Sequence, residues 1–230
     1  MDGQSSAMLY TVSTWIIPAI LAITLHEAAH GYVARRFGDT TAWSLGRVTL
    51  NPFKHIDPFG TILLPGMLLL AHSPFLFGYA KPVPVNFARL ENPKRDMVWV
   101  ALAGPGTNIM LAIISALLLH LARYLPQPAS DWVAQNLLNS IIINVVLAVF
   151  NMIPLPPLDG GRVAVGLLPA PISRPLAALE PYGFFILLGI IFILPLLGRN
   201  LGLNLNFIST FISGVSGAII SAIVALTGLR

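Results

Sequence analysis

Residues 7–36 read AMLYTVSTWIIPAILAITLHEAAHGYVARR, an apolar run that ends in a short polar segment. No Asp, Glu, Lys or Arg occurs between positions 3 and 25, and about 20 apolar residues are enough to cross the hydrocarbon core of a bilayer. No proline follows Pro18 within this stretch. We therefore predict one membrane-spanning helix over residues 8–36, with polar groups in its last two turns.

The rest of the chain repeats this pattern of long uncharged runs. The 230 residues are 56% hydrophobic and 10% charged, with a mean hydropathy of +0.79, whereas a soluble domain carries about 25% charged residues. An ordinary water-soluble fold is thus excluded, and the predicted fold class is an all-α polytopic membrane protein with five to six transmembrane helices. The other uncharged runs are 58–80, 97–122, 132–158, 181–198 and 200–229.

One of these runs differs from the others because prolines and glycines interrupt it. Residues 59–79 contain Pro65, Gly66, Pro74 and Gly78. The segment 81–85 that follows is expected to be extended, since each proline disfavours the helical conformation of the residue before it. We predict a re-entrant hairpin around 59–85. Further helices are predicted over 97–122, 134–152, about 179–198 and about 206–229.

The charges and the first run exclude some classes of protein. The net charge of +4 does not indicate nucleic-acid binding, because the basic residues lie in short loops between apolar runs, where they set membrane orientation. The chain has no cysteine, so no disulfide is expected and the redox compartment stays open. The first run is not expected to be a signal peptide, since no Lys or Arg precedes it.

The polar segment His26-Glu27-Ala28-Ala29-His30 has the spacing of a metal site. Two histidines four residues apart lie about 40° apart around a helix, so both imidazoles can bind one ion. Glu27 can reach a water bound to that ion without being a ligand, which suits a general base. The alternative is a structural or interfacial histidine cluster.

A catalytic zinc site needs a third protein ligand and keeps a position for water. Asp159 is favoured because three prolines between 154 and 157 break the preceding helix, and irregular backbone at membrane depth is tolerated only where it is buried or lines a wet cavity. The alternative for Asp159 is an interfacial residue at a helix end. Asp39, Glu91, Asp96 and Asp131 are expected to be solvated; Asp57, Glu180 and the remaining histidines are the other candidates.

Three motifs together resemble the signatures of the site-2 protease family of intramembrane zinc metalloproteases. They are His26-Glu27-x-x-His30, Gly104-x-x-x-Asn108 and Asn151-x-x-Pro154-x-x-Pro157-Leu158-Asp159-Gly160. The chain looks most like the short bacterial and archaeal members that lack PDZ and CBS domains. The resemblance covers about 8–168 and implies one membrane-embedded metalloprotease domain over 1–230, in which the helices of about 179–229 are accessory.

The resemblance also implies roles for individual residues. It implies one catalytic Zn²⁺ held by His26, His30 and Asp159, with Glu27 activating water. Asn151 would position the substrate or stabilise the oxyanion, and Asn108 would lie near the site. The alternatives are a capping or interhelical hydrogen bond for Asn151 and close helix packing for Asn108. His55, His72 and His120 match no signature and are expected at the interface.

The ligands also constrain the topology. Both ligand-bearing helices carry their ligands near their C-terminal ends, so they should run parallel, with 97–122 as the only full crossing between them. A re-entrant 59–79 then divides the 13 Lys and Arg residues 11 to 2, whereas a spanning 59–79 divides them 6 to 7. The positive-inside rule favours the first arrangement and places the N-terminus outside and the metal site toward the cytoplasm. The 11 are Arg35, Arg36, Arg47, Lys54, Lys81, Arg89, Lys94, Arg95, Arg162, Arg174 and Arg230, against Arg123 and Arg199.

These features predict an intramembrane zinc metalloendopeptidase that acts in regulated intramembrane proteolysis. It would hydrolyse peptide bonds within or near the transmembrane segments of protein substrates, in a bacterial or archaeal cell membrane. The extended segment 81–85 would pair with an unwound substrate strand. A non-proteolytic metal-binding protein or transporter is the alternative, and a proteolytically dead relative is a third. Glu27 and the lack of an internal repeat favour the protease.

Overall fold

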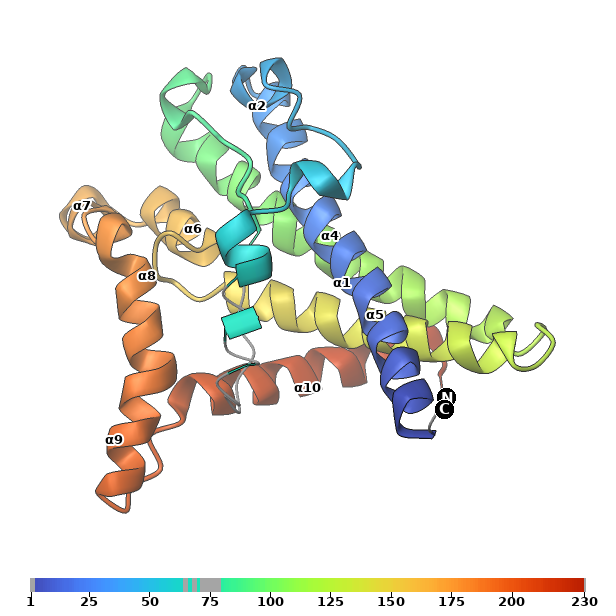
Figure 1. Cartoon of the computed structure of the whole chain (residues 1–230). Coiled ribbons are helices and arrows are strands. Elements are labelled where there is room, and N and C mark those ends of the chain that lie inside the picture. The colour runs from blue at the N-terminus through green and yellow to red at the C-terminus, as the bar shows by residue number, and fades with distance from the viewer. Residues whose placement is uncertain (1–2, 64–65, 68–69, 71–79, 230) are drawn as a thin grey trace.

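The computed structural model of the chain describes residues 3–63, 66–67, 70 and 80–229 (Figure 1). These residues form helices, turns and irregular segments, with no strand among them. The predicted all-α class is therefore confirmed. The re-entrant hairpin around 59–85 falls partly on 64–65, 68–69 and 71–79, which lie outside the described residues, and it stays a prediction.

Five helices in the described part of the chain are long and apolar enough to cross a membrane. Their positions agree with the five predicted helices, and the protein is an integral membrane protein. They are α1 (Gly3–Arg36), α4 (Pro93–Ala122), α5 (Ala129–Asn151), the continuous Glu180–Asn200 and α10 (Phe207–Thr227). Glu180–Asn200 consists of α8 (Glu180–Leu188), a π-helical turn (Gly189–Ile193) and α9 (Leu194–Asn200).

Shorter helices occupy the connections between these spans. They are α2 (Thr41–Ser44), η1 (Pro52–Lys54), the π-helical η2 (Pro58–Leu63), η3 (Phe87–Arg89), α6 (Asp159–Leu167) and α7 (Ala170–Ala177). Residues 80–86 form no helix, as the prolines at 82 and 84 predict.

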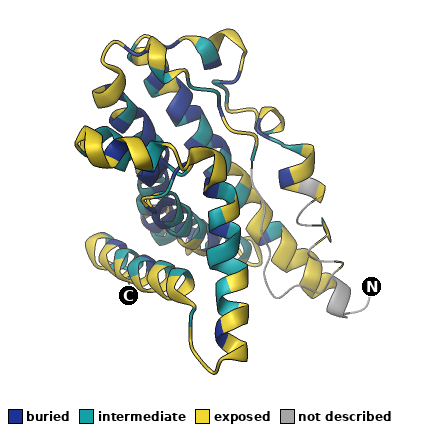
Figure 2. Cartoon of the chain, turned by 90° about the vertical axis from the view of Figure 1, so that its left-hand side faces the viewer, coloured by how far each residue is buried: buried dark blue, intermediate teal, exposed yellow. Residues whose placement is uncertain are grey.

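The helix surfaces show the residue distribution expected in lipid. Small and polar side chains are buried between helices, such as Ala112, Ala116 and Asn108, each 0% exposed. Large apolar side chains face outward along the same helices, including Leu117 at 51% exposed, and exposed residues dominate the outer faces in Figure 2. Small residues let helix backbones approach, and buried polar side chains link helices by hydrogen bonds.

Helices α1, α4 and α5 form the centre of the structure, and α10 packs along α4 and α5 (Figure 1). The apolar part of this centre is one cluster of buried residues from three helices. It consists of Ala112, Ala116, Ile141, Val145, Val149 and Ile223.

Helices α1 and α5 run in the same direction, as predicted from the ligand positions. Near their N-terminal ends, Trp132 Nε1 of α5 donates to Ser13 Oγ of α1 at 3.0 Å. Toward their C-terminal ends, His26 in the last third of α1 meets Asp159, which follows α5, with a separation of 3.3 Å between Nε2 and Oδ2. The N-terminal ends of α1 and α5 therefore lie together, and so do their C-terminal ends. Helix α4, which lies between them in the sequence, runs in the opposite direction.

The last helix differs from the topology that the charge count assumed. His120 Nε2, near the C-terminal end of α4, lies 2.8 Å from the carbonyl oxygen of Thr227, at the C-terminal end of α10. Helices α4 and α10 thus run in the same direction. The count placed the end of α10 on the side of Arg35, whereas the structure places it at the opposite end of the bundle.

Candidate metal centre

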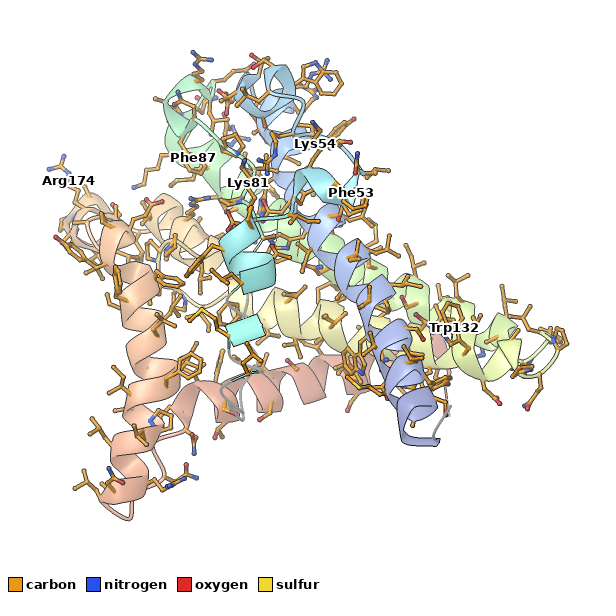
Figure 3. All side chains as sticks on the ribbon, in the orientation of Figure 1. Phe53, Lys54, Lys81, Phe87, Trp132 and Arg174 are labelled. Carbon is orange, nitrogen blue, oxygen red and sulfur yellow. The ribbon has the colours of Figure 1, made fainter. Side chains whose placement is uncertain are left out.

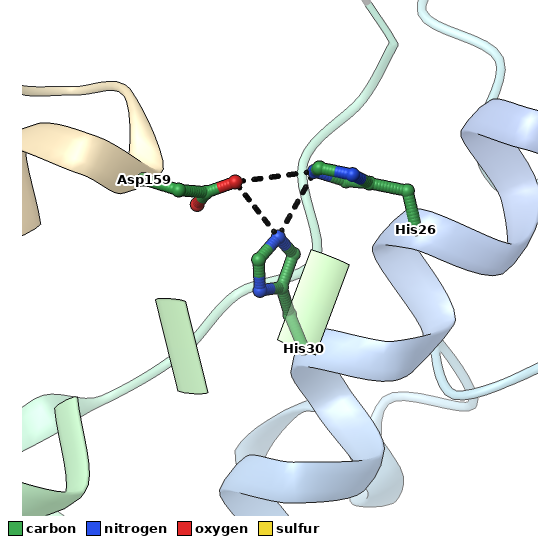
Figure 4. Close-up of side chains that lie close together, drawn as sticks. All are labelled: His26, His30 and Asp159. Atoms are coloured by element: carbon green, nitrogen blue, oxygen red, sulfur yellow. Dashed lines mark hydrogen bonds and ion pairs between the residues drawn. The ribbon is translucent and has the colours of Figure 1, made fainter. Parts of the chain in front are cut away.

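Three buried side chains from two distant parts of the chain meet at one point (Figure 4). His26 and His30 lie one turn apart on α1, and Asp159 is the first residue of α6. The Nε2 atoms of the two histidines are 3.1 Å apart. Oδ2 of Asp159 lies 3.3 Å from Nε2 of His26 and 3.4 Å from Nε2 of His30.

The turn between α5 and α6 delivers Asp159 because glycines follow it. A Cβ atom on Gly160 would overlap the Met152 carbonyl, and one on Gly161 would overlap the backbone nitrogen of Pro156. The start of α6 therefore packs directly on the proline-containing turn, which only residues without a side chain permit at these two positions. This packing fixes the direction in which the Asp159 carboxylate leaves the helix.

Gly104 makes room for the two histidines. A Cβ atom at this position of α4 would overlap the Nε2 atoms of His26 and His30. The close-packing interpretation of the Gly104-x-x-x-Asn108 motif therefore applies to its glycine. Asn108 has a different position, because it is fully buried and its Oδ1 lies 2.6 Å from Nδ1 of His26.

Hydrogen bonds fix the tautomer of both imidazoles. Nδ1 of His30 lies 2.7 Å from the Val100 carbonyl oxygen. A carbonyl only accepts hydrogen bonds, so Nδ1 carries the proton and Nε2 presents a lone pair. His26 has the same arrangement toward Asn108. Both Nε2 lone pairs are therefore available at the point where the three side chains meet, as metal-binding histidines require.

The three ligand atoms fit a zinc ion. A tetrahedral zinc with bonds of about 2.0–2.1 Å to nitrogen and oxygen separates its ligand atoms by about 3.3 Å, which is close to the separations of 3.1–3.4 Å found here. The Oδ2 atom of Asp159 is buried and accepts no hydrogen bond. Two lone pairs and a carboxylate oxygen repel one another unless a cation lies between them.

The position of Asp159 agrees with this role. It lies in the first turn of α6, where the helix N-terminus interacts favourably with a negative charge.

Glu27 lies beside the three ligands and contacts the extended segment. Its Oε2 atom accepts a hydrogen bond of 2.7 Å from the backbone nitrogen of Val83, and Val83 is itself buried. The nitrogen of Lys81 donates to the carbonyl oxygen of His55 at 2.9 Å. The segment 81–85 is thus held by its backbone at two alternate residues, and one of the two bonds, from Val83, goes to Glu27.

Asn151 lies in the last turn of α5, and its Nδ2 donates to the Leu147 carbonyl oxygen at 3.0 Å. This is a hydrogen bond within its own helix, close to the capping alternative considered from the sequence. The half-buried Asn151 side chain therefore has a structural contact within α5, and its role toward a substrate stays a prediction.

Two carboxylates expected to be solvated are buried instead. Asp39 is 1% and Asp96 3% exposed. The prediction failed because each accepts hydrogen bonds from backbone nitrogens: Asp39 from Thr41 and Asn86, and Asp96 from Asn92. Turn and helix-start carboxylates often make such bonds.

The histidines outside the motif have structural positions. His55 is buried and its Nε2 lies 3.0 Å from the Thr49 carbonyl oxygen, so its expected interfacial position is wrong. His120 contacts the end of α10, and His72 lies outside the described residues.

Sequence reasoning missed the groups that hold the ligands in place. The Val100 carbonyl and the Val83 nitrogen are backbone groups, so no residue type in the sequence indicates their contacts. Asn144, whose Oδ1 accepts from Asn108 Nδ2 at 2.8 Å, could have been found, because it is a polar residue in an apolar run. A polar residue within an apolar helix is a reason to look for a functional contact.

Comparison with known proteins places these motifs in a family. The chain matches the model of Peptidase family M50 over residues 14–124 and 120–195. YwhC of Bacillus subtilis, which is named as a zinc metalloprotease, is 42% identical over 193 residues, or 79% of this chain and 80% of the relative. No solved structure matches the chain.

Two further relatives carry the same kind of name. Rip2 of Mycolicibacterium smegmatis is 31% identical over 203 residues, covering 88% of this chain and 75% of the relative. MJ0611 of Methanocaldococcus jannaschii is 32% identical over 142 residues, covering 60% of this chain and 62% of the relative.

Proposed function

Because the chain belongs to peptidase family M50 and is a zinc metalloprotease, we propose that it cleaves membrane proteins within or near their transmembrane segments, in regulated intramembrane proteolysis. The observation that carries this proposal is the position of the metal centre. His26, His30 and Asp159 converge as buried side chains among helices long and apolar enough to span a bilayer. A peptide bond reaching this point must come from a chain within or close to the membrane.

We assign His26, His30 and Asp159 as the ligands of one Zn²⁺. A zinc ion with three protein ligands and an open position supplies a Lewis acid and nucleophilic water near neutral pH. The chain's own contribution is to hold three ligand atoms at fixed separations and to keep both Nε2 atoms unprotonated through bonds at Nδ1.

Glu27 is the proposed general base. It would take the proton of the attacking water and deliver it to the leaving amine, which is the role of a carboxylate within reach of the site that is not itself a ligand. The Val83 nitrogen donates to Oε2 and orients this carboxylate. Asn151 would position the substrate or its oxyanion after its amide leaves the Leu147 carbonyl, and Asn108 would act on His26.

The segment 81–85 has one edge that can pair with a substrate. In an extended chain, the backbone groups of alternate residues point to the same side, and Pro82 and Pro84 have no N–H to donate. The edge that carries Val83 and Val85 is therefore the one with N–H groups to donate, and we assign it to the substrate strand, next to Glu27. The Val83 N–H, which donates to Glu27 Oε2, would have to leave that carboxylate to pair with the substrate.

The site is proposed to face the cytoplasm of a bacterial or archaeal cell, with transmembrane proteins and the lipid bilayer as partners and no nucleic acid. Lys54, Lys81 and Arg174 lie toward one end of the structure and Trp132 toward the other (Figure 3). This distribution supports the positive-inside orientation. The transporter or other non-proteolytic metal protein considered from the sequence would have no use for Glu27 beside the ligands, and membership of peptidase family M50 argues against it.

The test is cleavage of a tagged single-pass membrane protein in liposomes. Glu27→Gln should retain zinc and lose turnover by about 10²–10⁴-fold, whereas Glu91→Gln, at an exposed glutamate outside the site, should match the wild type. Removal of zinc by a chelator should abolish cleavage. Unchanged cleavage by Glu27→Gln would overturn the assigned base, and zinc flux into liposomes without cleavage would support the transporter.

A further inference from the structure

A chain of buried polar groups continues from the metal centre into the middle of the helix bundle. It runs from His26 of α1 through Asn108 of α4 to Asn144 and Ser140 of α5. Asn108 is 0% and Asn144 1% exposed. The links are His26 Nδ1 to Asn108 Oδ1 at 2.6 Å, Asn108 Nδ2 to Asn144 Oδ1 at 2.8 Å, and Asn144 Nδ2 to the Ser140 carbonyl at 2.9 Å.

The order of donors and acceptors along this chain follows from its far end. The Ser140 carbonyl only accepts, so it fixes which end of the Asn144 side chain carries the NH₂ group. The Asn144 oxygen then faces Asn108 and accepts from its NH₂ group. The Asn108 oxygen is left facing His26, and it can accept only if Nδ1 carries the proton. The Nε2 atom of His26 is then free for a metal.

A second acceptor supports the same orientation more weakly. Asn108 Nδ2 also donates to the Ala22 carbonyl at 3.2 Å, a longer bond than the 2.8 Å bond to Asn144. Ala22 lies four residues before His26 on α1, so its carbonyl is also the regular helix acceptor for the His26 N–H. Loss of Asn144 would therefore weaken the orientation of Asn108 without abolishing it.

We propose that Asn144 is a positioning residue for the metal centre: with the Ser140 carbonyl behind it, it holds the Asn108 amide in the orientation that leaves Nε2 of His26 unprotonated. The inference rests on the proposed role of His26 as a zinc ligand. Partners of metal-bound histidines change metal affinity by about 10–100-fold when they are removed. Asn144 does not contact His26 directly but acts through Asn108, so its removal should have a smaller effect than removal of Asn108.

The chain offers a matched control on the same helix. Asn139 is 2% exposed and also links α5 to α1, since its Nδ2 donates to the Thr14 carbonyl at 2.9 Å. It is an asparagine at the same kind of buried interhelical position, but its contact is toward the start of α1. Substitution of either Asn139 or Asn144 would weaken the packing of α5. Only substitution of Asn144 should also lower the affinity for the metal.

The experiment measures metal affinity of the purified full-length chain in detergent, by competition between the protein and a chelating dye for Zn²⁺ and for Co²⁺. Asn144→Leu should lower the affinity about tenfold and Asn108→Leu by up to about 100-fold. Asn139→Leu should match the wild type.

A second measurement needs no substitution. The ¹⁵N chemical shifts of the five histidine rings in zinc-loaded protein report which ring nitrogen carries a proton and which binds the metal. We expect His26 to carry its proton on Nδ1, toward Asn108, and to bind zinc through Nε2, and zinc bound through Nδ1 of wild-type His26 would overturn the proposal even if Asn144→Leu did not fold. Equal metal affinities of Asn144→Leu and Asn139→Leu would also overturn it.

Failure of the proposed function would look different. A wild-type chain that bound no zinc, or bound it equally well after His26→Ala, would remove His26 from the ligand set. Tight zinc binding that needs His26 but ignores Asn144 would leave the proposed function in place and reject only the positioning role.

Discussion

Gly104 of α4 lies so close to His30 of α1 that a Cβ atom at position 104 would overlap Nε2 of the imidazole. The helix contact that builds the bundle and the contact that forms the metal centre are therefore the same contact. Small residues allow such close approach of helices in membranes. Here the approach also sets how far the two histidines can move toward α4.

Gly104→Ala should therefore destroy metal binding. The added methyl group takes the space of the two Nε2 atoms, and the shift it forces would move a ligand atom out of place. We expect a loss of zinc affinity of at least about 100-fold, since the loss of one ligand exceeds the effect of an outer partner. Zinc content after dialysis measures it.

Gly106→Ala is the control for this substitution. It lies two residues further along the same helix, and a Cβ atom there would have no neighbour within 4 Å. Zinc content should be unchanged, and alanine is favoured over glycine within a helix by about 1 kcal/mol. Equal zinc binding by Gly104→Ala and Gly106→Ala would show that the ligands do not lie where the structure places them.

Removal of zinc should lower thermal stability. Two lone pairs and a buried carboxylate face one another at the centre, so the ion stabilises the native state by its binding free energy. A ligand at 100 times its dissociation constant contributes about 2.7 kcal/mol. The unfolding midpoint in detergent should fall after chelation and recover with zinc. His30→Ala should remove this zinc-dependent shift, and a shift that survives in His30→Ala would point to a different ion site.

The side chains of the motifs could be predicted from the sequence for two different reasons. His26 and His30 share a helix face, and the prolines before Asp159 indicate a helix broken to present a carboxylate. Asp39 and Asp96 were misassigned because their partners are backbone nitrogens, which every sequence contains. The direction of α10 could not be read from charges, because the count assumes that both apolar runs after Asp159 cross the membrane.

Asp39 should make stability depend on pH in the acid range. Burial alone would raise the pKa of this carboxyl group, but hydrogen bonds from Thr41 and Asn86 outweigh it and lower the pKa. A lowered native pKa contributes stability above the unfolded value of about 3.9, and this stability is lost as pH falls through the native pKa. These bonds join the end of α1 to the segment that follows Val85.

Asp39→Asn keeps one of the two acceptor oxygens. At neutral pH it should lower the unfolding midpoint, with a cost of about 1 kcal/mol for the lost bond. The difference from the wild type should shrink as pH falls below about 3.9, because the unfolded wild-type chain then binds a proton at Asp39. It should vanish once pH has fallen through the lower pKa of the native carboxyl group. Asp131→Asn, at an exposed aspartate, should leave the midpoint unchanged at every pH. A difference between wild type and Asp39→Asn that grew in acid would reverse the assigned sign.

The direction of α10 predicts which parts of the chain share a side of the membrane. The chain has no cysteine, so a single introduced thiol reports its own position. Ala88→Cys lies in the exposed connection before α4, and Gln127→Cys lies between α4 and α5. Leu229→Cys follows α10, whose end contacts His120 at the end of α4.

A membrane-impermeant maleimide should therefore label Leu229→Cys and Gln127→Cys from the same side of sealed vesicles, and Ala88→Cys from the other side. The positive-inside rule further predicts that Ala88→Cys reacts from the cytoplasmic side. Labelling of Leu229→Cys together with Ala88→Cys would mean that Glu180–Asn200 and α10 both cross fully, as the charge count assumed. The parallel packing of α4 and α10 would then be wrong. The metal centre would be unaffected, because in the described part of the chain the hydrogen bonds and ion pairs of the His26, His30 and Asp159 side chains are with α1, α4 and α6 and not with α10.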